Sequence, residues 1–307
     1  MAADGAVNML YPCLSVAALQ TLCFTFCQFK KDNSYIDVMW SLSFLLPNYM
    51  IIGAKMALNQ PIDGRTWAIN ACLTLWAVRL AYHIGMRHTG EDYRYVSLRE
   101  RMSTRGQCCY YINAFLLIFM LQAGLSLAVN YTVMKVTAVS SLQTFAAATA
   151  ASSAQSLLWT DYVGFGLFAC GFLFEVIGDS QLTTHIANPD PEKGKFCKTG
   201  LWRYTRHPNY FGEALLWWGF FVIACGVPKG YVTVFSPLII TLLLRYVSGV
   251  PLLERKARKH PEWAQYEAET AVFIPWFWDK DAVPKQQDNF VNPDDKAAQE
   301  QTQSKIN

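Results

Sequence analysis

Charged residues are scarce in this sequence. Asp, Glu, Lys and Arg make up only 16% of the 307 residues, whereas soluble globular domains carry roughly 25%. Apolar residues make up 52%, which excludes an intrinsically disordered chain, because such chains are rich in charge and poor in apolar residues. The 26 basic residues exceed the 23 acidic ones by only three. This net charge is too small for binding nucleic acid through bulk electrostatics.

Cysteine and metal-binding patterns are also sparse. Nine cysteines are too few for a disulfide scaffold in a chain of this length. The five histidines form no His-Glu-x-x-His pattern, and no cysteine pair has partners at the spacing of a zinc site. The sequence also contains neither a nucleophile elbow nor a Walker loop. We therefore expect no metal site.

Long apolar runs are what the sequence does contain. Seven stretches approach the roughly 20 apolar residues that cross a bilayer as a helix. A soluble all-α protein could bury one such helix in its core, but hardly seven. The sequence therefore predicts an all-α, polytopic membrane helical bundle with about seven transmembrane helices. The expected spans are 8–29, 36–58, 66–86, 110–134, 159–177, 211–227 and 231–253.

The distribution of basic residues predicts the orientation of these spans. Lys30 and Lys31 follow the first span, and acidic Asp4 precedes it, which argues against a cleaved signal peptide. With seven spans, the basic residues outside them divide at about five to one between the two sides. The N-terminus is therefore expected to be lumenal or outside, and the C-terminus cytoplasmic. We expect one membrane domain at 1–278 and a polar, disordered cytoplasmic tail at 279–307.

Seven ionisable residues in or next to the expected spans fall in the predicted cytoplasmic half. Such residues are costly in a bilayer and by default indicate function. Two pairs are spaced i, i+4, so each pair shares one helix face. Together these residues could line a cavity open to the cytosol; solvation at the membrane interface and structural ion pairing are the alternatives. They are Asp37, Arg79, His83, Glu175, Asp179, Glu213 and Arg245.

The segment 194–220 carries the densest polar signal. Several basic residues, among them Lys195 and Arg203, precede a helix whose first turn suits Pro208. A helix N-terminus beside basic residues is a plausible phosphate site. Asn209 and Glu213 follow at i, i+4 and could bind sugar hydroxyls or an amide group of a cofactor. The alternative is that the basic cluster only touches anionic lipid.

Residues 200–213 (GLWRYTRHPNYFGE) resemble the signature of membrane proteins with a steroid 5-alpha-reductase C-terminal domain. The resemblance is to the branch described as a domain of unknown function. It extends over about residues 34–278, through SYID at 34–37, the run GEDYRY at 90–95 and the segment 252–276. It implies a seven-helix enzyme of the endoplasmic reticulum membrane that binds NADPH from the cytosolic side and reduces a double bond in a lipid-like or steroid-like substrate.

The resemblance also implies which residues contact the cofactor. Asn209, Glu213 and Asp179 match positions that contact it in the steroid reductases, and Lys195 and Arg203 fall where family members meet phosphates. Steroid reductases also carry a Glu in the second span, which this sequence lacks. Asp37, Tyr82 and His83 are therefore the candidates for supplying the proton. The full expected cofactor set is Glu175, Asp179, Lys195, Arg203, Arg206, His207, Asn209, Tyr210 and Glu213.

Two other functions remain open. Isoprenylcysteine carboxyl methyltransferases and phospholipid N-methyltransferases share an Arg-His-Pro-x-Tyr-x-Gly string, matched here from Arg206 to Gly212, and use S-adenosylmethionine. They carry a Glu-Glu pair after the last span, where this chain has Leu253 and Glu254. The third hypothesis is a non-catalytic lipid-binding or scaffold protein. In each case the expected partners are membrane lipids and a lipid-like small molecule, not nucleic acid.

Overall fold

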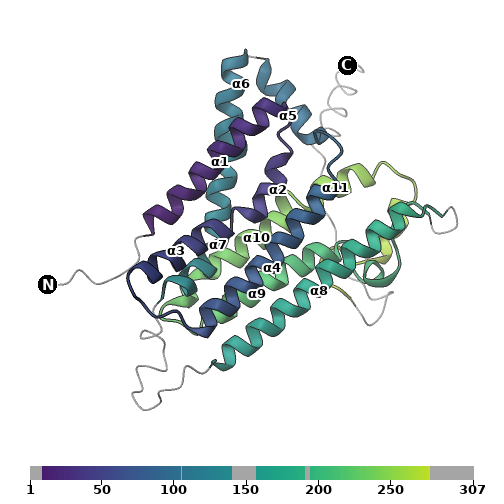
Figure 1. Ribbon diagram of the computed structural model, residues 1–307. Coiled ribbons are helices and arrows are strands. Elements are labelled where there is room, and N and C mark those ends of the chain that lie inside the picture. The colour runs from purple at the N-terminus through teal and green to yellow at the C-terminus, as the bar shows by residue number, and fades with distance from the viewer. Residues whose placement is uncertain (1–8, 105, 140–156, 191–193, 277–307) are drawn as a thin grey trace, which may run out of the picture. The chain divides into compact units, whose positions relative to one another are not determined.

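The computed structural model describes residues 9–104, 106–139, 157–190 and 194–276. Within these ranges every regular element is a helix and no β-strand occurs (Figure 1). The predicted all-α class is therefore confirmed. The tail predicted at 279–307 lies outside the described residues.

Five helices in the described part of the chain are long and apolar enough to cross a membrane. The protein is therefore an integral membrane protein of the polytopic kind. The predicted third and sixth spans also form helices, α4 (Gly64–Met86) and α9 (Pro208–Ala224), but these are not among the five. Seven spans and the orientation of the termini stay predictions. The five are Leu10–Lys30, Tyr35–Ala57, Gln107–Ala138, Trp159–Ala187 and Gly230–Ala257.

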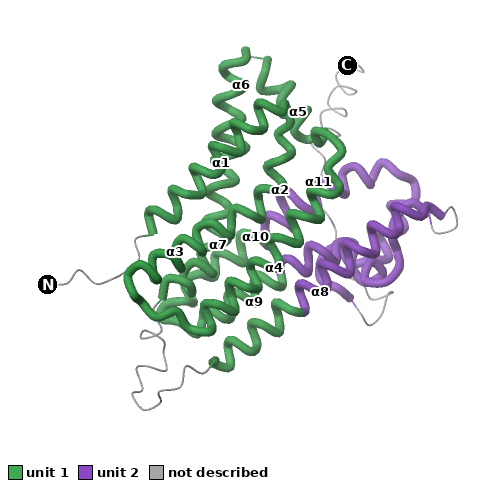
Figure 2. Tube along the Cα trace, in the orientation of Figure 1, with its two compact units in different colours: residues 1–169, 215–240 green, residues 170–214, 241–307 purple. Residues whose placement is uncertain are grey.

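The chain divides into two compact units, which Figure 2 distinguishes by colour. Unit 1 comprises residues 1–169 and 215–240, and unit 2 comprises residues 170–214 and 241–307. Helices α8 (Trp159–Ala187) and α9 contribute residues to both. The predicted single membrane domain at 1–278 stays a prediction.

Unit 1 contains most of the helices. Apart from its parts of α8 and α9, they are α1 (Leu10–Lys30), α2 (Tyr35–Leu42), α3 (Leu45–Ala57), α4, α5 (Tyr93–Ser103), α6 (Gln107–Ala114), the π-helical η1 (Phe115–Met120), α7 (Leu121–Ala138), η5 (Gly230–Val234) and the start of α10 (Phe235–Leu242). The predicted span 36–58 is thus two helices. Ser43, between them, donates from its hydroxyl to the carbonyl oxygen of Trp40 at 2.6 Å, a local bond that competes with the helical ladder.

Side-chain caps set the start of two helices in unit 1. The carboxylate of Asp63 accepts from the backbone N–H of Thr66 at 2.8 Å and begins α4. Asp92 accepts from the N–H of Arg94 at 2.8 Å and begins α5. Both satisfy backbone donors that the first helical turn leaves without a partner. The second cap places the side chain of Tyr95 in the interior of unit 1.

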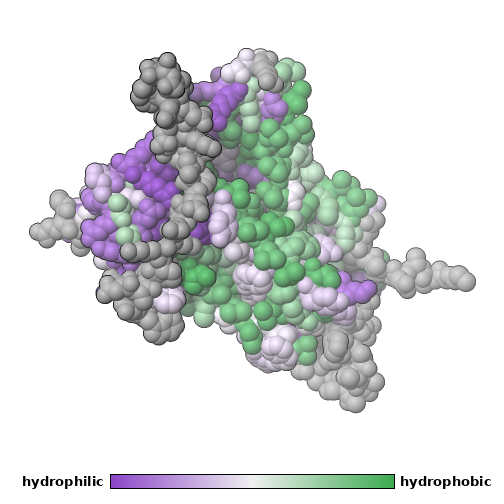
Figure 3. Space-filling model, turned by 180° about the vertical axis from the view of Figure 1, so that it is seen from behind, coloured by the Kyte–Doolittle hydropathy of each residue, from purple (hydrophilic) through white to green (hydrophobic). Residues whose placement is uncertain are grey.

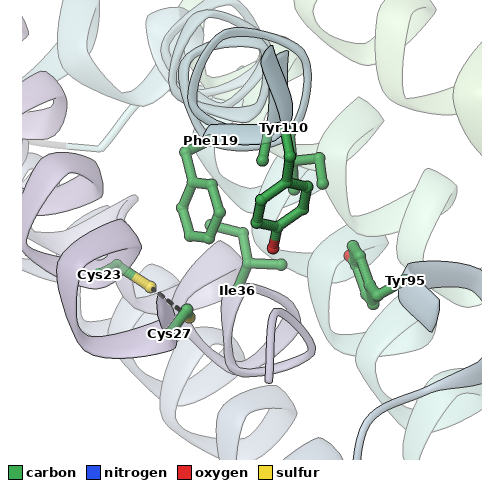
Figure 4. Packing of buried hydrophobic residues seen from close by; sticks show 8 residues of the cluster. Cys23, Cys27, Ile36, Tyr95, Tyr110 and Phe119 are labelled. Atoms are coloured by element: carbon green, nitrogen blue, oxygen red, sulfur yellow. Dashed lines mark hydrogen bonds between the residues drawn. The ribbon is translucent and has the colours of Figure 1, made fainter. Parts of the chain in front are cut away.

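The core of unit 1 is aromatic and tightly packed. In Figure 4, Phe119 and Tyr110 point toward Ile36, in the same cluster as Cys23 and Cys27. A second group joins Phe44, Trp76 and Trp217, whose ring centroids lie 5.2–5.3 Å apart. Two of these three pairs, Phe44–Trp76 and Trp76–Trp217, meet edge to face, a geometry that adds to the stability gained from burial.

Buried polar pairs also join the helices of unit 1. Arg65 and Asp161 form a bidentate ion pair with both nitrogen–oxygen distances at 2.7 Å, and Asp161 is fully buried. The ammonium of Lys55, also fully buried, donates to the carbonyl oxygens of Thr137 and Val139. Such bonds matter in a bilayer, because apolar burial drives helix association less there than in water.

The surface of unit 1 is rich in exposed apolar side chains. On the face drawn in Figure 3 these side chains cover much of the described surface. Helix α1 alone exposes Leu14, Leu22, Phe26 and Phe29, the last with 81% of its area accessible. A surface of this kind is expected for a protein that faces lipid tails.

Unit 2 is smaller and more polar. Trp202 donates from its indole N–H to the carbonyl oxygen of Gly178 at 2.9 Å, and Tyr266 donates to the carbonyl oxygen of Trp202 at 2.9 Å. These bonds hold the loop before α9 against α8 and the last helix. Apart from its parts of α8, α9 and α10, the helices are η4 (Gly200–Arg203), the π-helical η6 (Leu243–Val247), α11 (Val250–Ala257) and α12 (Trp263–Glu269).

Candidate functional site

The segment that leads into α9 is fixed by backbone hydrogen bonds within unit 2. The N–H of Arg206 donates to the carbonyl oxygen of Ala271 at 2.8 Å, and the hydroxyl of Thr205 donates to that of Phe273 at 2.9 Å. The helix then begins at Pro208, which has no N–H to lose in a first turn. The residues at the start of α9 are therefore held in a defined position.

Glycines bring the start of α9 against α8. A Cβ on Gly178 would lie 3.2 Å from the backbone nitrogen of Asn209, and a Cβ on Gly212 would lie 2.6 Å from that of Glu175. Close approach of this kind needs residues without side chains. It allows the amide of Asn209 to donate to a carboxylate oxygen of Asp179 at 2.9 Å. The structure thus brings together two residues that the sequence assigned to one site.

Three carboxyl groups are buried around this contact. Glu175 and Asp179 on α8 and Glu213 on α9 are 2%, 6% and 7% exposed. Buried carboxylates accept hydrogen bonds from hydroxyl and amide groups but repel phosphates. The cluster therefore suits the sugar or amide part of a ligand.

Arg206 and His207 meet at Glu254 on α11. The Arg206 Nε donates to Glu254 Oε1 at 2.8 Å, and the His207 Nε2 lies 3.0 Å from the same oxygen. The other guanidinium nitrogens of Arg206 donate to the carbonyl oxygens of Glu267 and Thr270 and to Glu254 Oε2. Arg206, expected as a cofactor contact, is thus bonded to protein oxygens at each of its side-chain nitrogens.

His207 is almost completely buried and its ring is fixed. Its plane stacks on the ring of Tyr210, with centroids 5.5 Å apart and an interplanar angle of 5°. Burial lowers the pKa of His207, and the charges of Arg206 and Arg245 lower it further, against the opposing effect of Glu254. The imidazole is therefore neutral at physiological pH.

Lys195 and Arg203, expected at phosphates, are both exposed in unit 2. The backbone N–H of Lys195 donates to Glu262 at 2.9 Å, and Arg203 ends η4. Both ammonium and guanidinium groups are accessible to a soluble anion. Their role at phosphates stays a prediction.

The proton-donor candidates lie in unit 1 and have different surroundings. Tyr82 is 68% exposed, and His83 lies 3.2 Å from a guanidinium nitrogen of Arg87 in an exposed position. Asp37 instead forms a network. Its carboxylate accepts from the hydroxyl of Tyr95 at 2.5 Å and from Arg94 at 2.8 Å.

Tyr95 is the residue that sequence reasoning missed. Burial and the neighbouring Asp37 raise its pKa well above the ordinary value, with Arg94 opposing. The phenol therefore stays protonated at neutral pH. The run at 90–95 belongs to the resemblance, but its spacing from Asp37 gives no sign that Tyr95 folds back onto that carboxylate. Glu254 was missed for the same reason, since its partners lie 47 and 48 positions away.

Among the described residues, no group of three or more His, Cys, Asp or Glu side chains could hold a metal ion. The polar clusters of both units are instead built from carboxylates with hydrogen-bond donors.

The helices, the exposed apolar surface and these buried polar clusters define a polytopic membrane protein with polar groups in its interior. The chain belongs to the family described as "Protein of unknown function (DUF1295)", which matches residues 23–270. An uncharacterised protein of the fission yeast Schizosaccharomyces pombe is 26% identical over 273 residues, covering 80% of this chain and 73% of that protein. Human 3-oxo-5-alpha-steroid 4-dehydrogenase 1 is 25% identical over 121 residues, covering 38% of this chain and 41% of the human protein. No solved structure matches.

Proposed function

We propose that this protein is an NADPH-dependent reductase of a carbon–carbon double bond in a lipid-like or steroid-like substrate, located in the endoplasmic reticulum membrane. The observation that carries the proposal is the hydrogen bond between Asn209 and Asp179, set among three buried carboxyl groups at the start of α9. The partial similarity to the human steroid 4-dehydrogenase supports the same reading. Location in the endoplasmic reticulum is expected from the family resemblance alone.

The residues of unit 2 fit two different parts of NADPH, its hydroxyl and amide groups and its phosphates. Asn209, Asp179 and Glu213 suit the hydroxyl and amide groups of the dinucleotide, because they offer both donors and acceptors. The phosphates need cations, which the exposed Lys195 and Arg203 supply. NADPH, when bound, supplies a hydride to one carbon of the substrate double bond.

The other carbon needs a proton, which we assign to Tyr95. The O–H bond of Tyr95 breaks and a C–H bond forms on the substrate, leaving a phenolate that solvent reprotonates. In the structure this proton is hydrogen-bonded to Asp37, so that bond must break before the proton can move to the substrate. The Arg94 guanidinium, 5.5 Å from the centre of the Tyr95 ring, stabilises the negative charge afterwards.

Thermal unfolding of the detergent-purified protein with each cofactor tests the proposal. A ligand that binds only the native state raises stability by about 2.7 kcal/mol at one hundred times its dissociation constant. We expect NADPH to raise the melting temperature, and S-adenosylmethionine to leave it unchanged. A shift with S-adenosylmethionine alone would refute the reductase and favour a methyltransferase. No shift with NADPH, NADH or S-adenosylmethionine would favour a lipid-binding or scaffold protein.

Two variants separate cofactor binding from proton transfer. Asn209→Ala is expected to abolish the NADPH shift, whereas Asn188→Ala, at an exposed asparagine directly after α8, should keep it. Tyr95→Phe should keep the NADPH shift and lose at least a hundredfold in NADPH oxidation with a 3-oxo-4-ene steroid or another accepted enone lipid. Tyr162→Phe, at an exposed tyrosine, is the matched control. Full turnover by Tyr95→Phe would remove that residue from the mechanism.

A further inference from the structure

The buried polar cluster in unit 2 is centred on Glu254, which contacts both Arg206 and His207. Its side chain is 3% exposed and its Oε1 lies 2.8 Å from Arg206 Nε and 3.0 Å from His207 Nε2. Its Oε2 lies 3.4 Å from Arg206 Nη2 and 3.6 Å from Arg258 Nη2. Two guanidinium groups therefore hold Glu254 as a carboxylate, which accepts hydrogen bonds and donates none.

The charge on Glu254 decides which nitrogen of His207 carries the proton. A neutral imidazole has one N–H, and the nitrogen that faces a carboxylate must be the donor. Burial keeps His207 neutral by lowering its pKa. The hydrogen-bond network therefore assigns the proton to Nε2 and leaves Nδ1 with a bare lone pair.

The Nδ1 atom of His207 is buried and has no hydrogen-bond partner in the described chain. The ring cannot turn to relieve this, because Glu254 holds one edge and the stacked ring of Tyr210 fixes its plane. A buried acceptor without a donor is costly unless another molecule supplies one. An apolar residue would fill the same space without that cost.

We propose that Glu254 is a positioning residue, which holds His207 as the Nε2–H tautomer so that Nδ1 accepts a hydrogen bond from an N–H or O–H group of the bound ligand. This inference rests on the proposed function. In a dinucleotide the donor is a carboxamide N–H or a ribose hydroxyl.

The tautomer can be observed without any ligand. In the full-length protein labelled with ¹⁵N-histidine, the signals absent from His207→Gln identify His207. We expect one protonated nitrogen, bonded to the ring carbons as Nε2, and an unprotonated Nδ1. Glu254→Gln should reduce this preference, because an amide can also donate to Nε2. A proton on Nδ1, or a doubly protonated ring near neutral pH, would overturn the inference whatever the cofactor proves to be.

Two isosteres test the acceptor. Counting bonds from Cβ, the Gln amide nitrogen occupies the place of Nε2 and the Asn amide oxygen that of Nδ1. His207→Gln should keep the contact with Glu254 and the melting temperature, but weaken NADPH binding about tenfold, the worth of one hydrogen bond. His207→Asn should melt earlier and bind NADPH more tightly than His207→Gln.

Wild-type affinity in His207→Gln would overturn the inference while leaving the reductase intact. Failure of the wild-type protein to bind NADPH would instead refute the proposed function. The tautomer measurement would still decide the role of Glu254, so the two failures are distinguishable.

Discussion

Gly212→Ala is the sharpest test of the contact that builds the candidate site. A Cβ at this position would lie 2.6 Å from the backbone nitrogen of Glu175 and closer still to the carbonyl oxygen of Gly171. Real Cβ atoms essentially never come within 3.0 Å of another heavy atom. Because both of these atoms belong to the backbone, rotation of a side chain cannot relieve the clash. Helices α8 and α9 must separate by about 1 Å in unit 2.

The expected loss of stability follows from two opposing terms. Overpacking costs about 1–3 kcal/mol, and rigid backbone places this site at the upper end. Replacing glycine by alanine inside a helix returns about 0.5–1 kcal/mol. Gly166→Ala, on α8 rather than α9, keeps only the gain, because nothing lies within 4 Å of its Cβ. The two variants should therefore differ by about 3 kcal/mol.

Separation of the helices should also disable the site. The bond between Asn209 and Asp179 is 2.9 Å long, and about 1 Å more takes it beyond hydrogen-bonding range. Thermal unfolding followed by tryptophan fluorescence, with and without NADPH, measures both effects. Gly212→Ala should melt well below Gly166→Ala and show no NADPH shift. Equal melting temperatures would refute the packing argument, and a wild-type NADPH shift in a destabilised Gly212→Ala would separate the helix contact from ligand binding.

The remaining predictions concern stability. Asp161→Asn leaves the buried Arg65 without its counter-ion and should lower the free energy of unfolding by about 3–5 kcal/mol, as measured by thermal unfolding. The double variant Arg65→Met with Asp161→Leu should recover most of this loss. Equal losses in the single and double variants would contradict the pairing. His207 has a lowered pKa in the folded state, so its contribution to stability is full above about pH 6.5 and falls as pH drops below that value. The difference in melting temperature between wild type and His207→Gln should therefore change below pH 6.5 and stay constant above it; a change confined to alkaline pH would reverse the assigned sign.

Helix positions could be predicted because apolar composition is local information. The expected span 66–86 lies within α4, Gly64–Met86, and the span 159–177 starts where α8 starts. The expected end of the latter was ten residues short, since α8 continues to Ala187. Its polar extension is held by tertiary contacts, such as that of Gln181, whose side-chain oxygen accepts from the N–H of Leu201 at 2.9 Å. The hydropathy of the sequence does not predict that hydrogen bond.

Partners distant in the sequence could not be predicted from spacing. The i, i+4 rule placed Glu175 and Asp179 on one face of α8, but it gave no reason to join Asp179 to Asn209, 30 positions away. Nothing in the sequence predicted that Lys55 and Arg65 would both be buried in unit 1. Arg65 is buried because Asp161, 96 positions away, neutralises it. A single sequence shows the charges but not which of them meet.

A buried side chain whose hydrogen-bonding groups are all bonded within the protein is structural, whereas one with an unused group can bind a ligand. Arg65 and Arg206 are both buried and almost inaccessible. The charge of Arg65 is matched by the bidentate pair with Asp161, and each side-chain nitrogen of Arg206 donates to a protein oxygen, so neither gains from a further anion. His207, beside Arg206, differs because one of its two nitrogens is left unused inside the protein. The same cluster therefore contains a fully hydrogen-bonded side chain, Arg206, and an acceptor without a partner, His207 Nδ1. Loss of the Arg206 side chain should unfold unit 2. Loss of the His207 acceptor should leave unit 2 folded and weaken only the binding of the ligand. His207→Gln is therefore more informative than any substitution at Arg206.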